Sequence, residues 1–151
     1  FCCAATCAEA AAASRSCRSL SSASAAAASS AASPLKRRLL DQGVVAGIGN
    51  IVAAEACWRA GIHPHAPTGS LDGEDWRALL RCAREHVHDV LAQETGDEIA
   101  YVASTGPGGA SSFSCYGRGG LPCPRCGDEL AQGRLDGRVS TWCPRCQPGE
   151  V

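Results

Sequence analysis

The feature that most constrains the fold of this chain is a matched pair of Cys-Pro-Arg-Cys motifs near its C-terminal end. Cys123 and Cys126 form the first pair, Cys143 and Cys146 form the second, and sixteen residues lie between them. A two-residue gap lets one tight turn direct both sulfurs at a single ion, and the second pair completes a tetrahedron of thiolates. The spacing therefore predicts a structural site for Zn²⁺. Two disulfides, or a redox-active Cys-x-x-Cys pair, are the alternatives.

The residues between the two cysteine pairs predict a β-hairpin. Asp136-Gly137 is a strong signal for a two-residue type I′ turn, and it is flanked by strand-like residues 129–135 and 138–142. The metal would then join the open ends of a hairpin whose tip carries Arg134 and Arg138. Because so small a ribbon buries little apolar surface, its folding is expected to depend on the metal.

Upstream of the ribbon, capping residues and apolar periodicity predict three helices. Ser33 is expected to cap the first helix with Pro34 at its first position, Gly61 to end the second, and Asp72 to cap the third. The expected helices cover residues 35–42, 51–60 and 73–94.

The third helix is strongly amphipathic, and its apolar stripe is expected to face the core. The four histidines are expected to be solvated, although two of them, in the loop 62–70, could also act as ligands. The stripe comprises Trp76, Leu79, Leu80, Ala83, Val87, Val90 and Leu91, and the histidines are His63, His65, His86 and His88.

Gly43 is expected to end the first helix, and the turn that follows, residues 44–50, contains Gly47 and Gly49. Such a turn exposes backbone N–H groups at the start of the following helix, and glycine lets an anion approach the backbone closely. Phosphate binding there is one interpretation of the pattern, and simple turn formation is the other.

The net charge of −1 gives no global sign of nucleic-acid binding, so any such surface must be local. Residues 35–60 carry four Lys or Arg against two acids, and residues 115–146 carry five against three. Residues 70–100 carry three against eight. Two basic regions that flank an acidic one suit a DNA clamp, although solvated faces produce the same pattern.

The first 34 residues do not have the pattern of a folded domain, because 14 are Ala and 9 are Ser, without an apolar period. We expect disorder or a lone helix there. A fragment edge, coding sequence translated in the wrong frame, a linker and a transit peptide are the competing explanations. No signal peptide or membrane span is visible, and the eleven cysteines fit a reducing, intracellular compartment.

Five stretches together resemble the formamidopyrimidine-DNA glycosylase/endonuclease VIII family. Residues 40–51, 54–55 and 59–64 are similar to its helix–two-turn–helix, and residues 116–118 and 138–143, with the cysteine pairs, are similar to its zinc finger. The resemblance covers residues 34–147. It implies a mainly α fold with a small zinc-bound β-hairpin, and a protein that removes oxidised purines from DNA and nicks the abasic strand.

The resemblance also implies which residues hold the DNA. They are Asn50, the turn of Gly47, Ile48 and Gly49, Lys36, and Arg138, which would contact phosphate across the lesion. The family assigns to the Arg138 position a proton-donor role in δ-elimination. A guanidinium with a pKa above about 12 is a poor acid, so holding the departing phosphate is the role we favour.

Three departures from the family pattern affect these expectations. Gly43 stands where a lysine is common, and Val52 replaces a usual tyrosine. The family's nucleophile is an N-terminal proline amine, whereas this chain starts with Phe1 and its first proline, Pro34, is internal. As written, the chain is therefore expected not to excise bases by itself.

These observations predict a low-complexity leader (residues 1–33), a helix–two-turn–helix domain (34–113) and a zinc finger (114–151). The predicted function is the DNA-binding part of a base-excision DNA glycosylase and AP lyase for 8-oxoguanine and formamidopyrimidine. The predicted partner is double-stranded DNA with oxidised bases or abasic sites, bound by a monomer in the bacterial cytoplasm, or in a nucleus or organelle. The alternatives are a non-catalytic zinc protein that binds damaged DNA, and a zinc ribbon for protein or RNA contacts.

Overall fold

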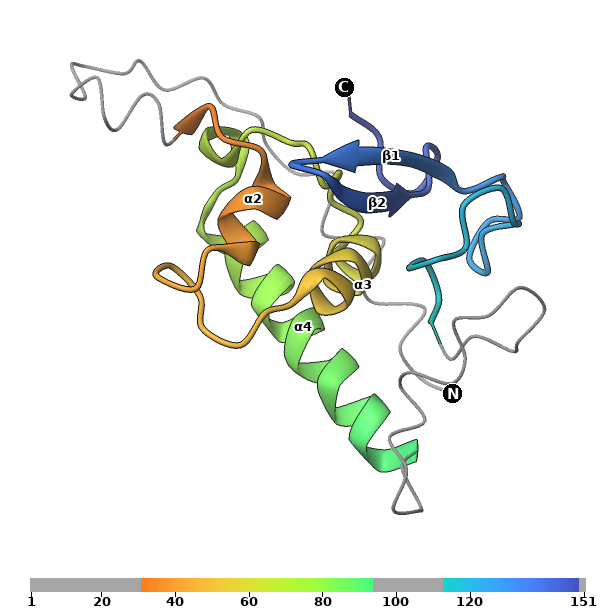
Figure 1. Ribbon diagram of the computed structural model, residues 1–151, viewed down its shortest axis with the longest axis horizontal. Coiled ribbons are helices and arrows are strands. Elements are labelled where there is room, and N and C mark those ends of the chain that lie inside the picture. Colours follow the sequence, from red (N-terminus) through yellow and green to blue (C-terminus); the bar gives the residue numbers. More distant parts are fainter. Residues whose placement is uncertain (1–30, 94–112, 150–151) are drawn as a thin grey trace.

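The computed structural model describes residues 31–93 and 113–149. The prediction for the leader before residue 31 lies outside the described residues, and so does the expectation that the glycine-rich residues 106–109 form a mobile loop. No described helix is long and apolar enough to cross a membrane. In chain order the elements are α2 (Leu35–Leu40), α3 (Asn50–Ala60), a 3-10 turn (Thr68–Ser70), α4 (Gly73–Gln93), β1 (Ala131–Leu135) and β2 (Arg138–Trp142) (Figure 1).

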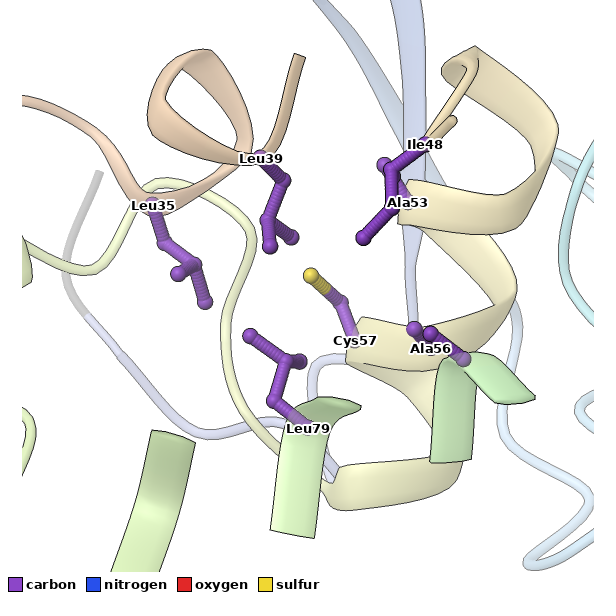
Figure 2. Close-up of a cluster of buried hydrophobic side chains, with 8 residues drawn as sticks. Leu35, Leu39, Ile48, Ala53, Ala56, Cys57 and Leu79 are labelled. Carbon is purple, nitrogen blue, oxygen red and sulfur yellow. The ribbon is translucent and has the colours of Figure 1, made fainter. Parts of the chain in front are cut away.

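The three helices pack around one apolar core, which confirms the mainly helical prediction. Figure 2 shows side chains from α2, α3 and α4 pointing toward one another. Burial raises the pKa of Cys57 to about 12, so this thiol stays neutral and packs as a small apolar side chain. The core consists of Leu35, Leu39, Ile48, Ala53, Ala56, Cys57, Leu79 and Ala83.

Two of the predicted helix ends are confirmed and two are wrong. Gly61 ends α3 as predicted, whereas α2 ends at Leu40, two residues before the predicted end, with Asp41 at its C-terminal cap. Asp72 caps α4 as predicted, because its Oδ1 accepts the N–H groups of Glu74 and Asp75 at 2.8 and 2.9 Å. The predicted cap of the first helix is wrong by one residue: Pro34 occupies the cap position, and no side chain caps α2. The loop supplies the acceptors instead, since the N–H groups of Leu35 and Lys36 donate to backbone carbonyls of residues 66 and 64.

The buried face of α4 differs from the prediction. Leu80, Val87 and Leu91 are exposed, at 38%, 41% and 63%, whereas Cys82 and His86 are buried. Leu79, Cys82, Ala83 and His86 recur at helical spacing, and this stripe faces the rest of the protein. Figure 1 shows the C-terminal half of α4, which carries the exposed Val87 and Leu91, extending beyond α3.

The hairpin forms as predicted. The register pairs Leu135 with Arg138 and Ala131 with Trp142, so Asp136 and Gly137 alone form the loop. Both loop residues have positive φ, 50° and 75°, as a type I′ turn requires. Strand β1 starts two residues later than expected, because Leu130 pairs its backbone with Gly120 and Leu121 instead.

Helix α3 lies between α4 and the hairpin (Figure 1), and both of its sides are buried. One side joins the helical core, and the other presents Trp58 to a second cluster formed with Cys115, Cys123, Leu130 and Cys143. The low amphipathicity of α3 is that of a helix enclosed on both sides. This helix therefore connects the helical core to the cysteine-rich segment.

Three histidines are not solvated, contrary to the prediction. His63 is 3% exposed and its ring meets the indole of Trp142 edge-on, with centroids 5.1 Å apart. His65 is half-buried on the same indole at 5.4 Å. His86 is buried in the α4 stripe near Phe113, and only His88 is exposed as predicted. Burial lowers the pKa of His63, His65 and His86, so all three favour the neutral form.

Candidate nucleic-acid interface and metal centre

The four cysteines of the two motifs meet at one point. The Sγ atoms of Cys123, Cys126, Cys143 and Cys146 lie within 4.8 Å of one another. A tetrahedron with Zn–S bonds of about 2.3 Å has sulfurs about 3.8 Å apart, so the cluster is suited to binding zinc. The two disulfides are not formed: Cys126 and Cys143, on different motifs, have sulfurs 3.4 Å apart, and none of the four cysteines is in a disulfide.

The electrostatics of the cluster also favour a dication. Burial opposes ionisation of Cys123, but backbone N–H groups and the Trp58 indole outweigh it and lower the pKa of that thiol to about 6. For Cys146, burial and the neighbouring thiols raise the pKa above its usual range. Four thiolates this close repel one another unless a cation lies among them. The residues present therefore fit Zn²⁺ in a closed structural site.

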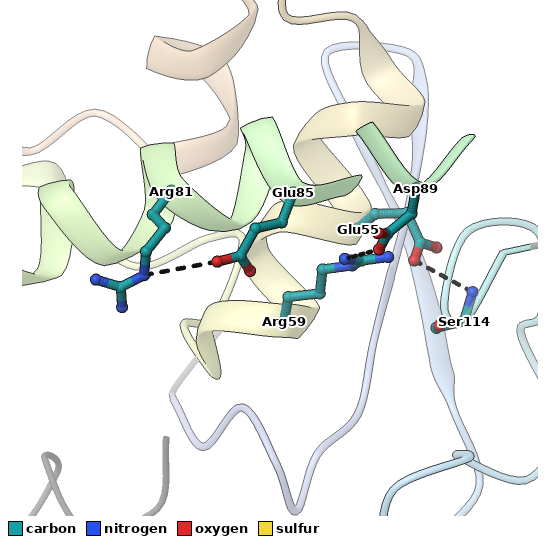
Figure 3. A network of polar contacts seen from close by, with 6 residues as sticks. All are labelled: Glu55, Arg59, Arg81, Glu85, Asp89 and Ser114. Atoms are coloured by element: carbon teal, nitrogen blue, oxygen red, sulfur yellow. Dashed lines mark hydrogen bonds and ion pairs between the residues drawn. The ribbon is translucent and has the colours of Figure 1, made fainter. Parts of the chain in front are cut away.

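A buried carboxylate fastens the zinc-finger segment to α3. Glu55 is 1% exposed and accepts the backbone N–H groups of Ser114, Cys115 and Tyr116 at 3.1, 2.8 and 2.7 Å. Figure 3 shows Glu55 reaching from α3 to Ser114. Three donors compensate a charge that would otherwise be costly to bury.

Beside Glu55, an ion pair joins α3 to α4. Arg59 on α3 pairs with Asp89 on α4 at 2.6 Å (Figure 3). A looser pair, Arg81 with Glu85 at 3.9 Å, stays within α4. Helix α3 is therefore linked by polar contacts to both of its neighbours.

Further contacts fix the metal cluster against the end of α3. The Gln147 side chain accepts the N–H of Cys143 at 2.9 Å and donates to the Ile62 carbonyl at 2.9 Å. The Arg125 guanidinium stacks over the Trp58 ring at 4.5 Å and donates to the Arg59 carbonyl. These contacts attach the four-cysteine cluster to the C-terminal end of α3.

At the other end of α3, three of the predicted DNA-contacting residues come together. The Lys36 ammonium donates to the Val139 carbonyl at 2.5 Å, and the Asn50 amide nitrogen approaches the same oxygen at 3.4 Å. Val139 directly follows Arg138, whose side chain is exposed. The start of α3 and the arginine of the hairpin therefore lie at one place on the molecule, although about ninety residues separate them in sequence.

The burial of Lys36 also affects the protonation of its side chain. Lys36 is fully buried, and burial lowers the pKa of its ammonium. Asn50 Oδ1 is buried and has no hydrogen-bond partner among the described residues.

The glycine turn is braced by a side chain that the sequence did not single out. Gln42 Oε1 accepts the N–H of Gly47 at 2.9 Å, and Gln42 Nε2 donates to the Ile48 carbonyl at 3.0 Å. Gly47 has φ of 86°, which requires glycine. The Ile48 side chain is in the core, so only its backbone can serve a ligand. No side chain caps α3, whose first turn begins after the exposed Gly49.

The structure thus brings together Lys36, Asn50, the glycine turn and Arg138, and separately the four cysteines. Sequence reasoning assigned no role to Gln42, Glu55 and Gln147, which hold these groups in place. A signal existed for Glu55, because it is the one acid in α3 and is flanked by apolar residues on both sides. A buried acid needs hydrogen-bond donors, and these lie far away in the sequence.

Comparison with known proteins agrees with this geometry. The family model described as the formamidopyrimidine-DNA glycosylase H2TH domain matches residues 10–100, and the zinc finger found in FPG and IleRS matches residues 120–149. Formamidopyrimidine-DNA glycosylase of Rhodococcus jostii (strain RHA1) is 44% identical over 117 residues, which are 76% of this chain and 40% of the relative.

Two solved structures share the fold. The MutM (Fpg) protein of Thermus thermophilus has a TM-score of 0.64 at 39% identity, over 80% of this chain and 47% of that one. Lactococcus lactis Fpg in complex with FAPY-dG-containing DNA has a TM-score of 0.65 at 31% identity, over 78% and 43%.

This chain spans less than half the length of these relatives. The residues that the two family models match include the described helices, the hairpin and the four clustered cysteines. The H2TH family model, at residues 10–100, matches more than half of this chain. The chain belongs to the family defined by the formamidopyrimidine-DNA glycosylase H2TH domain.

Proposed function

We propose that this chain is the part of a base-excision DNA glycosylase and AP lyase that grips the DNA backbone, in an enzyme that acts on 8-oxoguanine and formamidopyrimidine. The observation on which the proposal rests is the convergence of the α3 N-terminus and the hairpin arginine at Val139. Support comes from the family membership and from the L. lactis relative, whose structure contains FAPY-dG DNA.

In this proposal the start of α3 binds one phosphate. The first-turn N–H groups of an α-helix have no partner within the helix, and the helix dipole favours an anion there. The backbone of Ile48 and Gly49 and the side chain of Asn50 face this end. Gly47 contributes close approach only, because its own N–H is already bonded to Gln42.

Arg138 supplies the second contact. Its exposed guanidinium binds a phosphate on the other side of the damaged nucleotide and neutralises the phosphate that leaves during strand cleavage. Holding the backbone at two points offsets the few kcal/mol needed to rotate a base out of the stack. Lys36 does not bind a phosphate directly, because its ammonium already donates to the Val139 carbonyl. It contributes its positive charge from a buried position.

Zinc acts structurally in this proposal: held by the four cysteines, it keeps the hairpin folded and so keeps Arg138 in place. Cysteines that hold zinc rather than form disulfides fit a reducing, DNA-containing compartment of a cell.

The test is binding of the zinc-loaded chain to a duplex with a tetrahydrofuran abasic analogue, measured by fluorescence anisotropy over a salt series. We expect affinity to fall with salt at a slope of about −0.9 per phosphate for roughly two to four phosphates. Arg138→Ala should weaken binding and reduce the slope by about one, and Asn50→Ala should weaken it as well. Arg77→Ala, which removes an exposed arginine from α4, is the control. Equal affinity of Arg138→Ala and the parent chain at every salt concentration would contradict the proposal.

A further inference from the structure

An ion pair joins α2 to the tip of the hairpin. Arg37 Nε lies 2.7 Å from Asp136 Oδ2, and Arg37 Nη2 lies 2.5 Å from Asp136 Oδ1. Two parallel bonds of this kind fix direction as well as distance. The side chains are 53% and 47% exposed, and exposed pairs add little to the stability of a fold. The consequence of this pair therefore lies in what it orients.

The pair and its neighbour hold the hairpin on both sides of Arg138. Arg37 binds the tip at Asp136, two residues before Arg138, and Lys36 binds the carbonyl of Val139, one residue after it. Both holding residues lie on the short helix α2. An isolated two-stranded hairpin is marginally stable in water, and its tip moves unless another element restrains it.

We propose that the Arg37–Asp136 pair is a clasp that positions Arg138 beside the N-terminus of α3, so that both groups engage one DNA strand together. This inference rests on the proposed function. It assigns a positioning role in DNA binding to Asp136, an acid that on charge alone would repel the ligand.

Removing the charge of Asp136 tests the proposal, because electrostatic repulsion and the positioning role predict opposite changes in DNA affinity. Asp136→Asn keeps the turn, because asparagine readily adopts the positive φ of 50° found here. The substitution removes a negative charge close to the DNA, so plain electrostatics expects tighter binding. If the ion pair positions Arg138, Asp136→Asn should bind DNA about 3- to 10-fold more weakly than the parent chain. Its salt slope should be reduced by about one, as for Arg138→Ala.

Three further variants separate the clasp from general effects. Arg37→Lys keeps the charge but cannot make two parallel bonds, and should weaken binding like Asp136→Asn. Asp136→Asn combined with Arg138→Ala should bind no more weakly than Arg138→Ala alone, since Asp136 acts through Arg138. Asp128→Asn is the matched control, because it removes an exposed acid that pairs with Arg145 elsewhere in the finger. We expect no loss of affinity for it.

Amide hydrogen exchange supplies a readout without DNA. In Asp136→Asn the amides of residues 137–139 should exchange faster, while those of residues 123–130 stay as in the parent chain. Unchanged exchange at the tip, or Asp136→Asn binding as tightly as the parent or more tightly, would refute the clasp and leave the proposed function standing. Absence of salt-dependent binding by the parent chain would refute the proposed function and, with it, the positioning role.

Discussion

At the scale of single residues, Glu55 illustrates how one side chain can join two parts of the chain. Its carboxylate is buried and accepts three consecutive backbone N–H groups. A short polar side chain at the same position could not reach them, and an apolar one would leave all three unsatisfied. The acid is therefore a structural requirement of the junction between α3 and the finger.

Replacing Glu55 by glutamine should destabilise the protein by about 2 kcal/mol or more, because an NH₂ group would then oppose an N–H donor and the charge would be lost. The measurement is urea-induced unfolding followed by far-UV circular dichroism. Glu85→Gln, on the exposed face of α4 with only a 3.9 Å ion pair, is the matched control and should change stability by less than about 0.5 kcal/mol. Equal effects of the two substitutions would show that burial of Glu55 does not matter.

At the scale of elements, the hairpin depends on partners outside itself. It has two strands of five residues, and Cys123 and Cys143 are part of the small cluster around Trp58. With so little apolar surface, the metal and the contacts to α2 and α3 must supply the order.

Chelation of zinc should therefore unfold the hairpin while α3 and α4 keep most of their helical signal. Amide exchange resolved along the chain would show loss of protection at residues 131–142, and DNA affinity should fall with it. Zinc added back should restore both, which separates metal loss from irreversible damage. Persistent protection of β1 and β2 without metal would contradict this expectation.

The structure also shows why some elements could be predicted from sequence and others could not. The cysteine spacing, the Asp136-Gly137 turn and the Asp72 cap involve residues close together in the chain, and all three predictions are confirmed. The prediction of the buried face of α4 was partly wrong, with Leu80 and Leu91 exposed. Apolar periodicity identifies a helix face but does not show which of its residues other elements will cover.

The contacts that organise the site were beyond such reasoning. The distance in sequence is 103 residues from Lys36 to Val139, 99 from Arg37 to Asp136, and 60 from Glu55 to Cys115. Each contact exists only once the helices and the finger have packed. Residue types and the resemblance identified Asn50 and Arg138 as binding candidates, but not the groups that place them.

At the scale of the whole molecule, the helical unit and the finger share one interface centred on α3. The predicted boundary between residues 113 and 114 stays a prediction. Phe113 is buried, and the next three residues donate their N–H groups to Glu55. Conditions that disturb this junction should act on the whole described fold.

One such condition is mild acid, through His86. This side chain is 2% exposed, and burial lowers its pKa below the value in an unfolded chain, with Glu55, Arg59 and Asp89 nearby. As pH falls through about 6.5, the unfolded chain takes up a proton that the folded chain does not, so stability should decrease. The decrease levels off below the folded pKa.

Unfolding measured in urea between pH 7.5 and 5.5 should show this decrease in the parent chain, and a shallower one in His86→Gln. His88→Gln, on the exposed side of the same helix, should keep the parent's pH dependence. Parallel curves for His86→Gln and the parent would exclude His86 as the source.

The way α3 receives the finger also limits how such a protein can be recombined. Three groups of this helix contact the finger: the Glu55 carboxylate accepts backbone N–H groups, and the Trp58 indole packs against the cysteines. The Arg59 carbonyl accepts a hydrogen bond from a guanidinium of the finger. A finger transplanted from another protein would meet a helix surface made for different donors. Because the other side of α3 packs in the core with α2 and α4, the helices and the finger can be exchanged only together, and chimaeras joined between α3 and the finger should express as poorly folded protein.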